Sequence, residues 1–166
     1  MTSPLLSDPR LIVGLDLPSI EAARALVERI GTGVESYKVG LTLLARPGGV
    51  AFAHELRAMG KTVVAIKDLP EMPEGMPGPE CLELSPTDID PCAHPQLDDS
   101  NDFLDQAATR SSTPLVDLTR YVCAQSVCHA MIGGVSVYFD DNHLSYTFAQ
   151  TLSPFLGRAL ERAIEP

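Results

Sequence analysis

The stretch Leu11–Gly40, LIVGLDLPSIEAARALVERIGTGVESYKVG, carries the clearest structural signal in the chain. Its residues 11–17 form an apolar run with an aspartate near the end, which is typical of a buried parallel strand. Ser19 is a suitable N-cap for the helical pattern that follows, and Gly31 is a suitable residue to end that helix. Residues 36–44 predict another strand. This order predicts a parallel β-α-β unit.

The alternation of strands and helices continues to about residue 69 and then stops. Seven prolines lie between Pro70 and Pro95, which predicts an irregular loop to about residue 100. The remaining elements are expected over these ranges: helix 49–60, strand 61–69, a short helix 101–110 with Ser100 as its cap, strand 113–123, strand or extended segment 133–141, and an amphipathic helix 146–165 with a turn or kink near Pro154.

Length and composition narrow the functional classes. The chain has 166 residues, of which 45% are hydrophobic, so one domain with a real core is expected over residues 1–166. Its net charge of −10 makes nucleic acid an unfavourable partner. We see no apolar run of membrane-spanning length and no signal peptide, and therefore expect a cytoplasmic protein. No cofactor is expected, and the oligomeric state is left open.

Four cysteines allow three interpretations. Cys81 with Cys92, and Cys123 with Cys128, would each close a short loop as a disulfide, which suits an oxidising compartment. Four free thiols would instead suit the cytosol. A zinc site is the third interpretation, although no CxxC pair is present.

The two parts of the chain differ in composition. Residues 1–60 contain six basic and six acidic residues, whereas residues 61–166 contain six basic and sixteen acidic ones. The second part also holds all four cysteines and ten of the fourteen prolines. This shift predicts that the two parts have different origins, with a seam near residues 56–68.

The first part resembles the N-terminal β-α-β region of orotidine 5′-phosphate decarboxylases. The resemblance covers roughly residues 10–67 and rests on "LDLP" and "YKVG". It implies that Asp16 contacts a ribose and that Lys38 belongs to a catalytic array of charged residues. Lys67 in "AIKDLP" takes the lysine position of the family's Asp-x-Lys-x-x-Asp motif.

That motif is incomplete in this chain. Ala65 and Pro70 stand where the family has its two aspartates. Asp68 cannot simply replace one of them, because adjacent residues on a strand point to opposite faces. The family fold is also a (β/α)₈ barrel of well over 200 residues. Capping of the following helix by Asp16, and solvated strand ends at Lys38 and Lys67, are the structural alternatives.

The second part, roughly residues 60–166, is similar to the C-terminal end of SGNH-type domains attached to membrane O-acyltransferases that modify cell-surface glycans. The similarity rests on an ordered set of motifs, namely "KDLP", a cysteine pair, "VDLTRYVC", "VCHAMIGG" and "YFDDNHLS". It implies that His143 is a general base and that Asp140 orients it, with Asp141 as the nearby alternative. The structural alternative is a capped turn with a surface histidine.

The other half of that catalytic machinery is missing. The family's Gly-Asp-Ser nucleophile block and its Gly-x-Asn-Asp block, which supplies part of the oxyanion hole, do not occur in this chain. Ser19 is separated from Asp16 by a proline, and Asp99-Ser100 lies in the irregular middle. Neither serine matches the nucleophile position.

The expected fold is a three-layer α/β sandwich with a mostly parallel sheet of about five strands, SGNH- or flavodoxin-like. Its first β-α-β-α-β part would come from a TIM-barrel-like pattern. Three functions remain open: an SGNH-like acyl-ester hydrolase or O-acyltransferase that lacks its nucleophile, an orotidine-phosphate decarboxylase-like lyase fragment, and a non-catalytic folded chimera. An active domain would use a small acyl ester or a glycan acceptor. Gene fusion, recombination and design would all produce such a chain.

Overall fold

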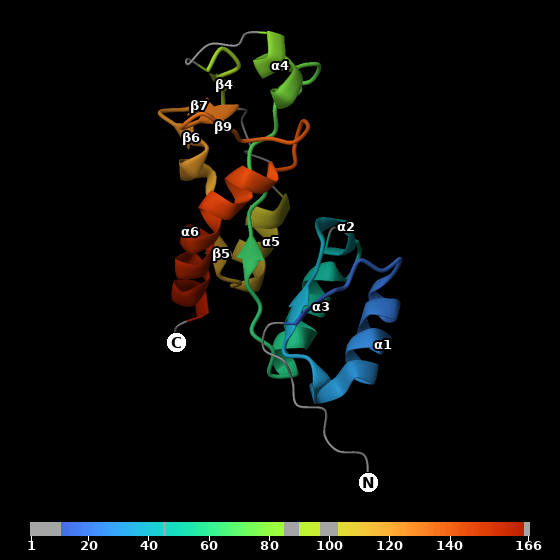
Figure 1. Cartoon of the computed structure of the whole chain (residues 1–166). Coiled ribbons are helices and arrows are strands. Elements are labelled where there is room, and N and C mark those ends of the chain that lie inside the picture. The colour runs from blue at the N-terminus through green and yellow to red at the C-terminus, as the bar shows by residue number, and fades with distance from the viewer. Residues whose placement is uncertain (1–10, 45, 85–89, 97–102, 165–166) are drawn as a thin grey trace. The chain divides into compact units, whose positions relative to one another are not determined.

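The computed structural model describes residues 11–44, 46–84, 90–96 and 103–164 (Figure 1). The chain forms two compact units, and each is described separately. The first unit takes the described residues up to Val63 together with residues 103–114, and the second takes those from Val64 to 102 together with residues 115–166. Both helices and strands are present, so the predicted α/β class is confirmed.

The first unit contains the predicted parallel β-α-β motif. Ser19 Oγ accepts a hydrogen bond from the Ala22 backbone N–H at 3.2 Å, and Gly31 has a φ of 59° directly after the helix, so both predicted helix ends are confirmed. The described elements are β1 (Ile12–Gly14), α1 (Ile20–Ile30), the 3₁₀ turn η1 (Gly31–Gly33), β2 (Ser36–Lys38), α2 (Leu41–Leu44), α3 (Gly49–Ala58) and α5 (Phe103–Ser111).

Buried apolar residues hold this unit together, and arginine side chains link its helices. Arg24 on α1 donates two hydrogen bonds to the Glu55 carboxylate on α3, at 2.7 and 2.9 Å. Arg57 donates to the Ser111 carbonyl at 2.6 Å and so satisfies an acceptor at the C-terminal end of α5. The core consists of Leu15, Ile20, Ala23, Val27, Leu43, Phe52 and Leu56.

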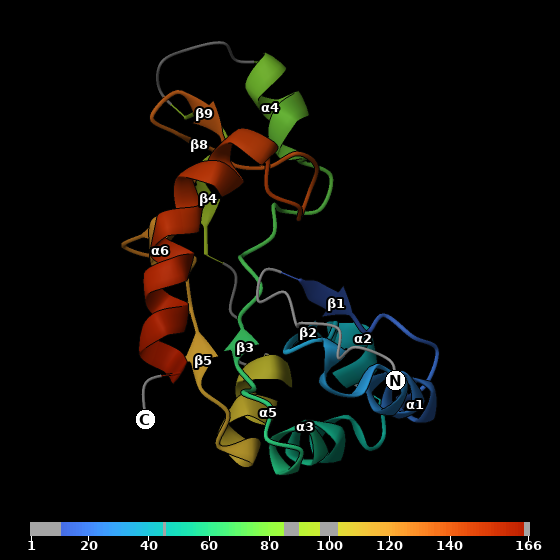
Figure 2. The same cartoon turned by 60° about the horizontal axis from the view of Figure 1, so that its bottom comes forward.

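The second unit is built on the C-terminal helix and several very short strands. In Figures 1 and 2 the helix α6 (Tyr146–Ile164) runs beside β5 (Leu115–Val116), and the antiparallel sheets lie near its N-terminal end. The other elements are β3 (Ala65–Ile66), α4 (Gly78–Leu84), β4 (His94–Pro95), β5 (Leu115–Val116), the 3₁₀ turn η2 (Thr119–Tyr121), β6 (Cys123–Ala124), β7 (Val127–Cys128), β8 (Met131–Ile132) and β9 (Val135–Ser136).

The prediction of one mostly parallel sheet of about five strands needs correction. Among the described residues, β1–β2 and β3–β5 are separate parallel pairs, β4–β7–β6 is an antiparallel sheet, and β8–β9 is an antiparallel pair. The strand predicted over residues 61–69 keeps only Ala65–Ile66. Two-residue strands offer too few ladder hydrogen bonds to build a wide sheet.

Other local predictions were wrong in instructive ways. The strand predicted over residues 36–44 ends at Lys38, and Leu41–Leu44 is helical. The loop predicted after Pro70 contains α4. The last helix is continuous from Tyr146 to Ile164, so the turn near Pro154 does not form, whereas the kink stays a prediction. The predicted cap Ser100 lies outside the described residues.

Both short-range cysteine pairs form disulfides. Cys81–Cys92 joins α4 to the segment before β4, and Cys123–Cys128 links paired residues of β6 and β7. Free cysteines are absent, so the alternatives of free thiols and a zinc site are wrong for this structure. Cys92 and Cys128 are fully buried in the core of the second unit.

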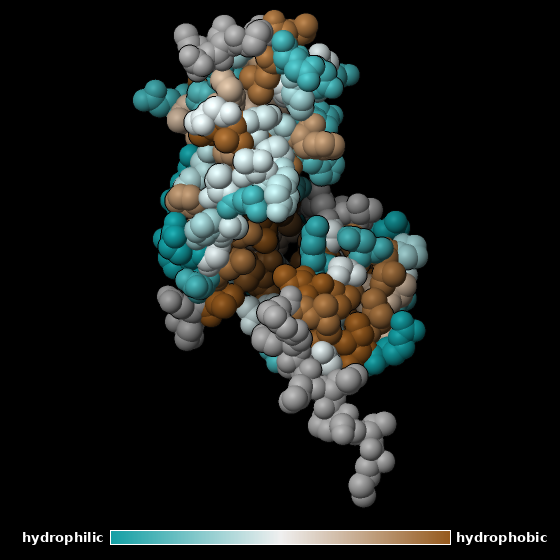
Figure 3. Space-filling view, viewed as in Figure 1, coloured by the Kyte–Doolittle hydropathy of each residue, from teal (hydrophilic) through white to brown (hydrophobic). Residues whose placement is uncertain are grey.

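Hydrophobic side chains also reach the surface. Figure 3 shows them on the exposed face of the first unit. Leu11 and Ile12, at the start of β1, are both exposed. A two-stranded sheet cannot bury both faces and both edges of its strands, which accounts for this exposure.

The disulfides should contribute most of the restraint on the loops of the second unit. Loop-closure entropy gives about 3 kcal/mol for Cys81–Cys92 and about 2 kcal/mol for Cys123–Cys128. We expect Cys81→Ser/Cys92→Ser to lower the free energy of unfolding more than Cys123→Ser/Cys128→Ser, as measured by urea denaturation. Equal stability of the parent protein with and without reductant would contradict this expectation.

Candidate active site

The candidate site lies on the loop that precedes α6. Phe139 N–H donates to the His143 carbonyl at 2.7 Å, and Tyr138 pairs with Leu144 in an isolated antiparallel bridge. These contacts close the loop around Asp140, so that its aspartate and histidine face each other.

Asp140 binds both the backbone and the side chain of the histidine. Its Oδ1 accepts hydrogen bonds from the backbone N–H of Asn142 at 3.0 Å and of His143 at 2.7 Å. Its Oδ2 accepts a hydrogen bond from His143 Nδ1 at 2.8 Å. Because a carboxylate can only accept here, Nδ1 carries the proton, and Nε2 of the neutral ring is left as an acceptor.

These hydrogen bonds favour the charged form of the aspartate. The backbone N–H groups of His143 and Asn142, together with the smaller effect of the His143 imidazole, lower the pKa of Asp140 from 3.8 to about 2. The His143 side chain is 75% exposed and that of Asp140 is 41% exposed. The pair is therefore oriented but open to water, which weakens its electrostatic effect.

Buried contacts fix both ends of this loop. Tyr138 is 1% exposed and donates its hydroxyl proton to the Pro70 carbonyl at 2.5 Å. Burial raises the pKa of Tyr138 to about 12. Met72 N–H donates to the Asp141 carbonyl at 2.8 Å, and the Ser145 hydroxyl accepts from Phe148 N–H at 3.2 Å as the N-cap of α6. The segment after β3 and the start of α6 thus hold the loop.

Hydroxyl groups near this loop are already engaged elsewhere. Ser136 Oγ donates to the Tyr138 carbonyl at 2.8 Å, and Ser145 Oγ donates to the Ser136 carbonyl at 2.5 Å. Ser19 caps α1 in the first unit, and Ser100 lies outside the described residues. None of the hydrogen bonds of the described residues joins a serine hydroxyl to His143.

The residues predicted for a decarboxylase are divided between the units. Asp16 follows β1 and Lys38 ends the adjacent parallel strand β2, so both lie at the same end of this pair. The Asp16 carboxylate lies against Gly40, where an added Cβ would come within 2.5 Å of Oδ1. Lys67 belongs to the second unit, where its N–H donates to the Val116 carbonyl at 2.9 Å.

The structure adds a second histidine–aspartate pair that sequence reasoning missed. His129 Nδ1 lies 3.3 Å from Asp90 Oδ2. The two residues are 39 positions apart, and Asp90 lies within the proline-rich region, so no sequence spacing predicts this pair. The described residues contain no cluster of three or more metal-ligating side chains, and no described helix is long and apolar enough to cross a membrane.

An α/β chain with a histidine–aspartate pair on the loop before its last helix fits the class of acyl-ester hydrolases. Comparison with known families agrees: the family described as "SGNH domain (fused to AT3 domains)" matches residues 24–158. The chain therefore belongs to the SGNH domain family.

A different likeness covers about a third of the chain. Orotidine 5′-phosphate decarboxylase of Caulobacter vibrioides (strain NA1000 / CB15N) is 56% identical over 57 residues, which are 34% of this chain and 24% of that protein. The enzyme of the same name from Methylobacterium radiotolerans is 50% identical over 60 residues, 35% of this chain and 26% of that protein. The chain thus spans about a quarter of the length of these relatives. No solved structure matches it significantly.

Together the two comparisons support a chimera-like description. The family match begins at residue 24, so it extends well into the decarboxylase-like part.

The loop geometry predicts the titration of Asp140. Because its folded pKa of about 2 lies below the ordinary value of 3.8, its contribution to stability is complete above pH 4 and is lost as the pH falls towards 2. Side-chain carboxyl ¹³C NMR should show a group titrating near pH 2 that disappears in Asp140→Asn. A midpoint for this group at or above 3.8 would show that the loop hydrogen bonds do not form.

Proposed function

We propose that the second unit is an acyl-ester hydrolase or O-acyltransferase domain of the SGNH type that has kept its base and lost its nucleophile. His143 is the base, and Asp140 selects its tautomer. The 2.8 Å hydrogen bond from His143 Nδ1 to Asp140 Oδ2 is the observation that carries this proposal, because it leaves Nε2 as the proton acceptor.

The geometry also explains why only slow ester hydrolysis is expected. A serine hydroxyl needs a base within about 2.6–3.2 Å, and the serines of this loop serve the backbone instead. An oxyanion also needs converging donors, which the absent sequence blocks would have supplied. The imidazole can therefore activate only water or attack a reactive ester directly. A small acyl ester or a glycan hydroxyl remains the proposed substrate class.

An activated ester tests this proposal. We expect slow hydrolysis of p-nitrophenyl acetate without an initial burst of p-nitrophenol. His143→Ala should lower the rate by up to about tenfold, less than the roughly 10²-fold or more that a general base contributes in a complete site. His54→Ala is the matched control, because His54 is an exposed histidine of α3 in the first unit, and it should keep the parent rate.

A serine-directed fluorophosphonate supplies the second measurement. We expect no labelling above that of the heat-denatured protein. A stoichiometric burst together with labelling that disappears in His143→Ala would show that a nucleophile is present. Equal esterase rates in the parent and His143→Ala would remove His143 as a catalyst and favour the non-catalytic chimera.

A decarboxylase-like lyase fragment is the second candidate. It is favoured by the placement of Asp16 and Lys38 at one end of the β1–β2 pair and by the 56% identity over 57 residues. It is disfavoured by Ala65 and Pro70, which replace two acidic residues of the catalytic motif.

Nucleotide binding distinguishes this candidate from the first. We expect uridine 5′-monophosphate at millimolar concentration to leave the NMR signals of Asp16, Lys38 and Gly40 unchanged, because most of a barrel's phosphate and base contacts lie beyond this fragment. Saturable shifts of these signals that are abolished by Lys38→Ala would support the lyase interpretation instead.

A further inference from the structure

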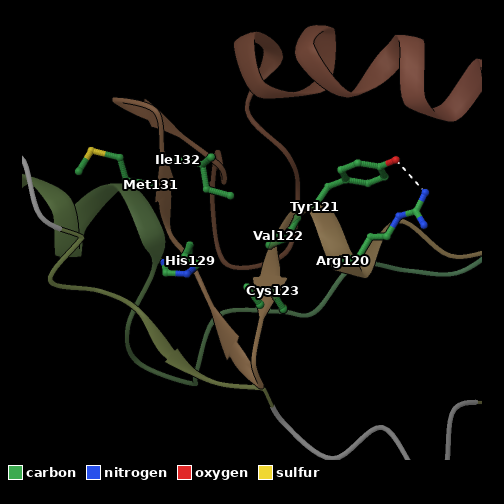
Figure 4. Close-up of a pocket in the computed structure, with 8 residues that line it drawn as sticks. Arg120, Tyr121, Val122, Cys123, His129, Met131 and Ile132 are labelled. Carbon is green, nitrogen blue, oxygen red and sulfur yellow. Dashed lines mark hydrogen bonds between the residues drawn. The ribbon is translucent and has the colours of Figure 1, made fainter.

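A pocket of about 280 Å³ lies beside the β6–β7 hairpin of the second unit (Figure 4). Figure 4 shows Arg120 and Tyr121 on one side of Val122 and Cys123, and His129 with Met131 and Ile132 on the other. His143, the proposed base, does not line this pocket. The pocket is therefore distinct from the candidate active site.

A buried carboxylate orients the imidazole of this pocket. Asp90 has a side chain that is only 9% exposed, and its Oδ2 accepts hydrogen bonds from the N–H groups of Ala130 at 2.9 Å and Met131 at 3.3 Å. Its Oδ1 accepts from Cys92 N–H at 3.0 Å. These bonds hold the carboxylate in place, and its Oδ2 lies 3.3 Å from His129 Nδ1. The Nδ1 proton points to Asp90, so Nε2 of the neutral ring is an acceptor.

The other polar groups of the pocket are already paired. Arg120 donates to the Tyr121 hydroxyl at 2.9 Å and lies over the same ring, 4.9 Å from its centroid. The ring of Tyr121 also packs against Phe155, with centroids 4.5 Å apart. Both Phe155 and Arg120 thus contact the Tyr121 ring, and Arg120 lies on the side of the pocket away from His129 (Figure 4). On the other side, His129 lines the pocket together with the apolar residues Met131 and Ile132.

We propose that this pocket binds a small amphiphilic alcohol. Its hydroxyl donates a hydrogen bond to His129 Nε2, and its short hydrocarbon chain packs against Val122, Met131 and Ile132. An apolar wall with one oriented acceptor is the usual arrangement of a small-molecule site. The proposal does not depend on any esterase activity of His143, because it concerns binding by a different histidine.

A pair of isomeric probes tests the hydrogen bond directly. NMR titration with 1-butanol should give saturable shifts at the His129 ring and at the methyl groups of Met131 and Ile132, while the His143 ring stays unchanged. Methyl propyl ether has the same atoms but no hydroxyl proton. We expect it to bind about 2- to 10-fold more weakly, as one net hydrogen bond implies. Each methylene added between ethanol and 1-butanol should tighten binding by up to about fourfold.

Variants separate the acceptor from the apolar wall. His129→Phe keeps a ring but removes the acceptor, so it should abolish the preference for alcohol over ether. His54→Phe changes an exposed histidine of the first unit and should leave the preference intact. Equal affinities of the parent for alcohol and ether, or shifts that grow linearly without saturation, would overturn the proposal. This comparison on the parent stands even if His129→Phe does not fold.

Discussion

The hydrogen bond from the Tyr138 hydroxyl to the Pro70 carbonyl is the contact on which the candidate site depends. It joins two segments 68 residues apart and lies in the core of the second unit. Met72 reinforces it by donating to the carbonyl of Asp141. A buried carbonyl that loses its donor costs about 1–3 kcal/mol, so this connection resists opening. The histidine loop is thereby attached to the strand-end segment that carries Lys67, whatever the chemistry of either.

The two histidine–aspartate pairs differ in the burial of the carboxylate and in the backbone groups that bind it. The Asp140 carboxylate lies at the surface, and its Oδ1 accepts hydrogen bonds from two backbone N–H groups of its own loop. At Asp90 the carboxylate is buried and bonded by backbone N–H groups from two segments, and it holds a histidine that faces a pocket. Water competes with the first pair and much less with the second. Because Asp90 is buried and Asp140 is exposed, His129 is the better placed of the two histidines to bind a small ligand.

Sequence reasoning worked where the signal was local. Ser19 and Gly31 were identified as helix ends because capping depends on neighbouring residues, and the proximity of Asp140 and His143 follows from three residues of spacing. It failed where pairing over long distances decides the result. The apolar run at 61–69 looked like a full strand, but only Ala65 and Ile66 find a partner in β5. The contact between Asp90 and His129 depends on a fold of the proline-rich region that no periodicity encodes. Both disulfides matched the shortest pairing.

The helix α5 belongs to the SGNH-like part of the sequence but to the first structural unit, where Leu104, Ala107 and Ala108 are buried and Arg57 of α3 bonds to its end. The polypeptide thus enters, leaves and re-enters each unit, so neither unit is formed by one continuous stretch of sequence. A protease cut after Val63 would therefore not release two independent halves. Any polypeptide that replaces residues 11–63 must therefore supply an arginine at the position of Arg57 and an apolar surface against which α5 can pack.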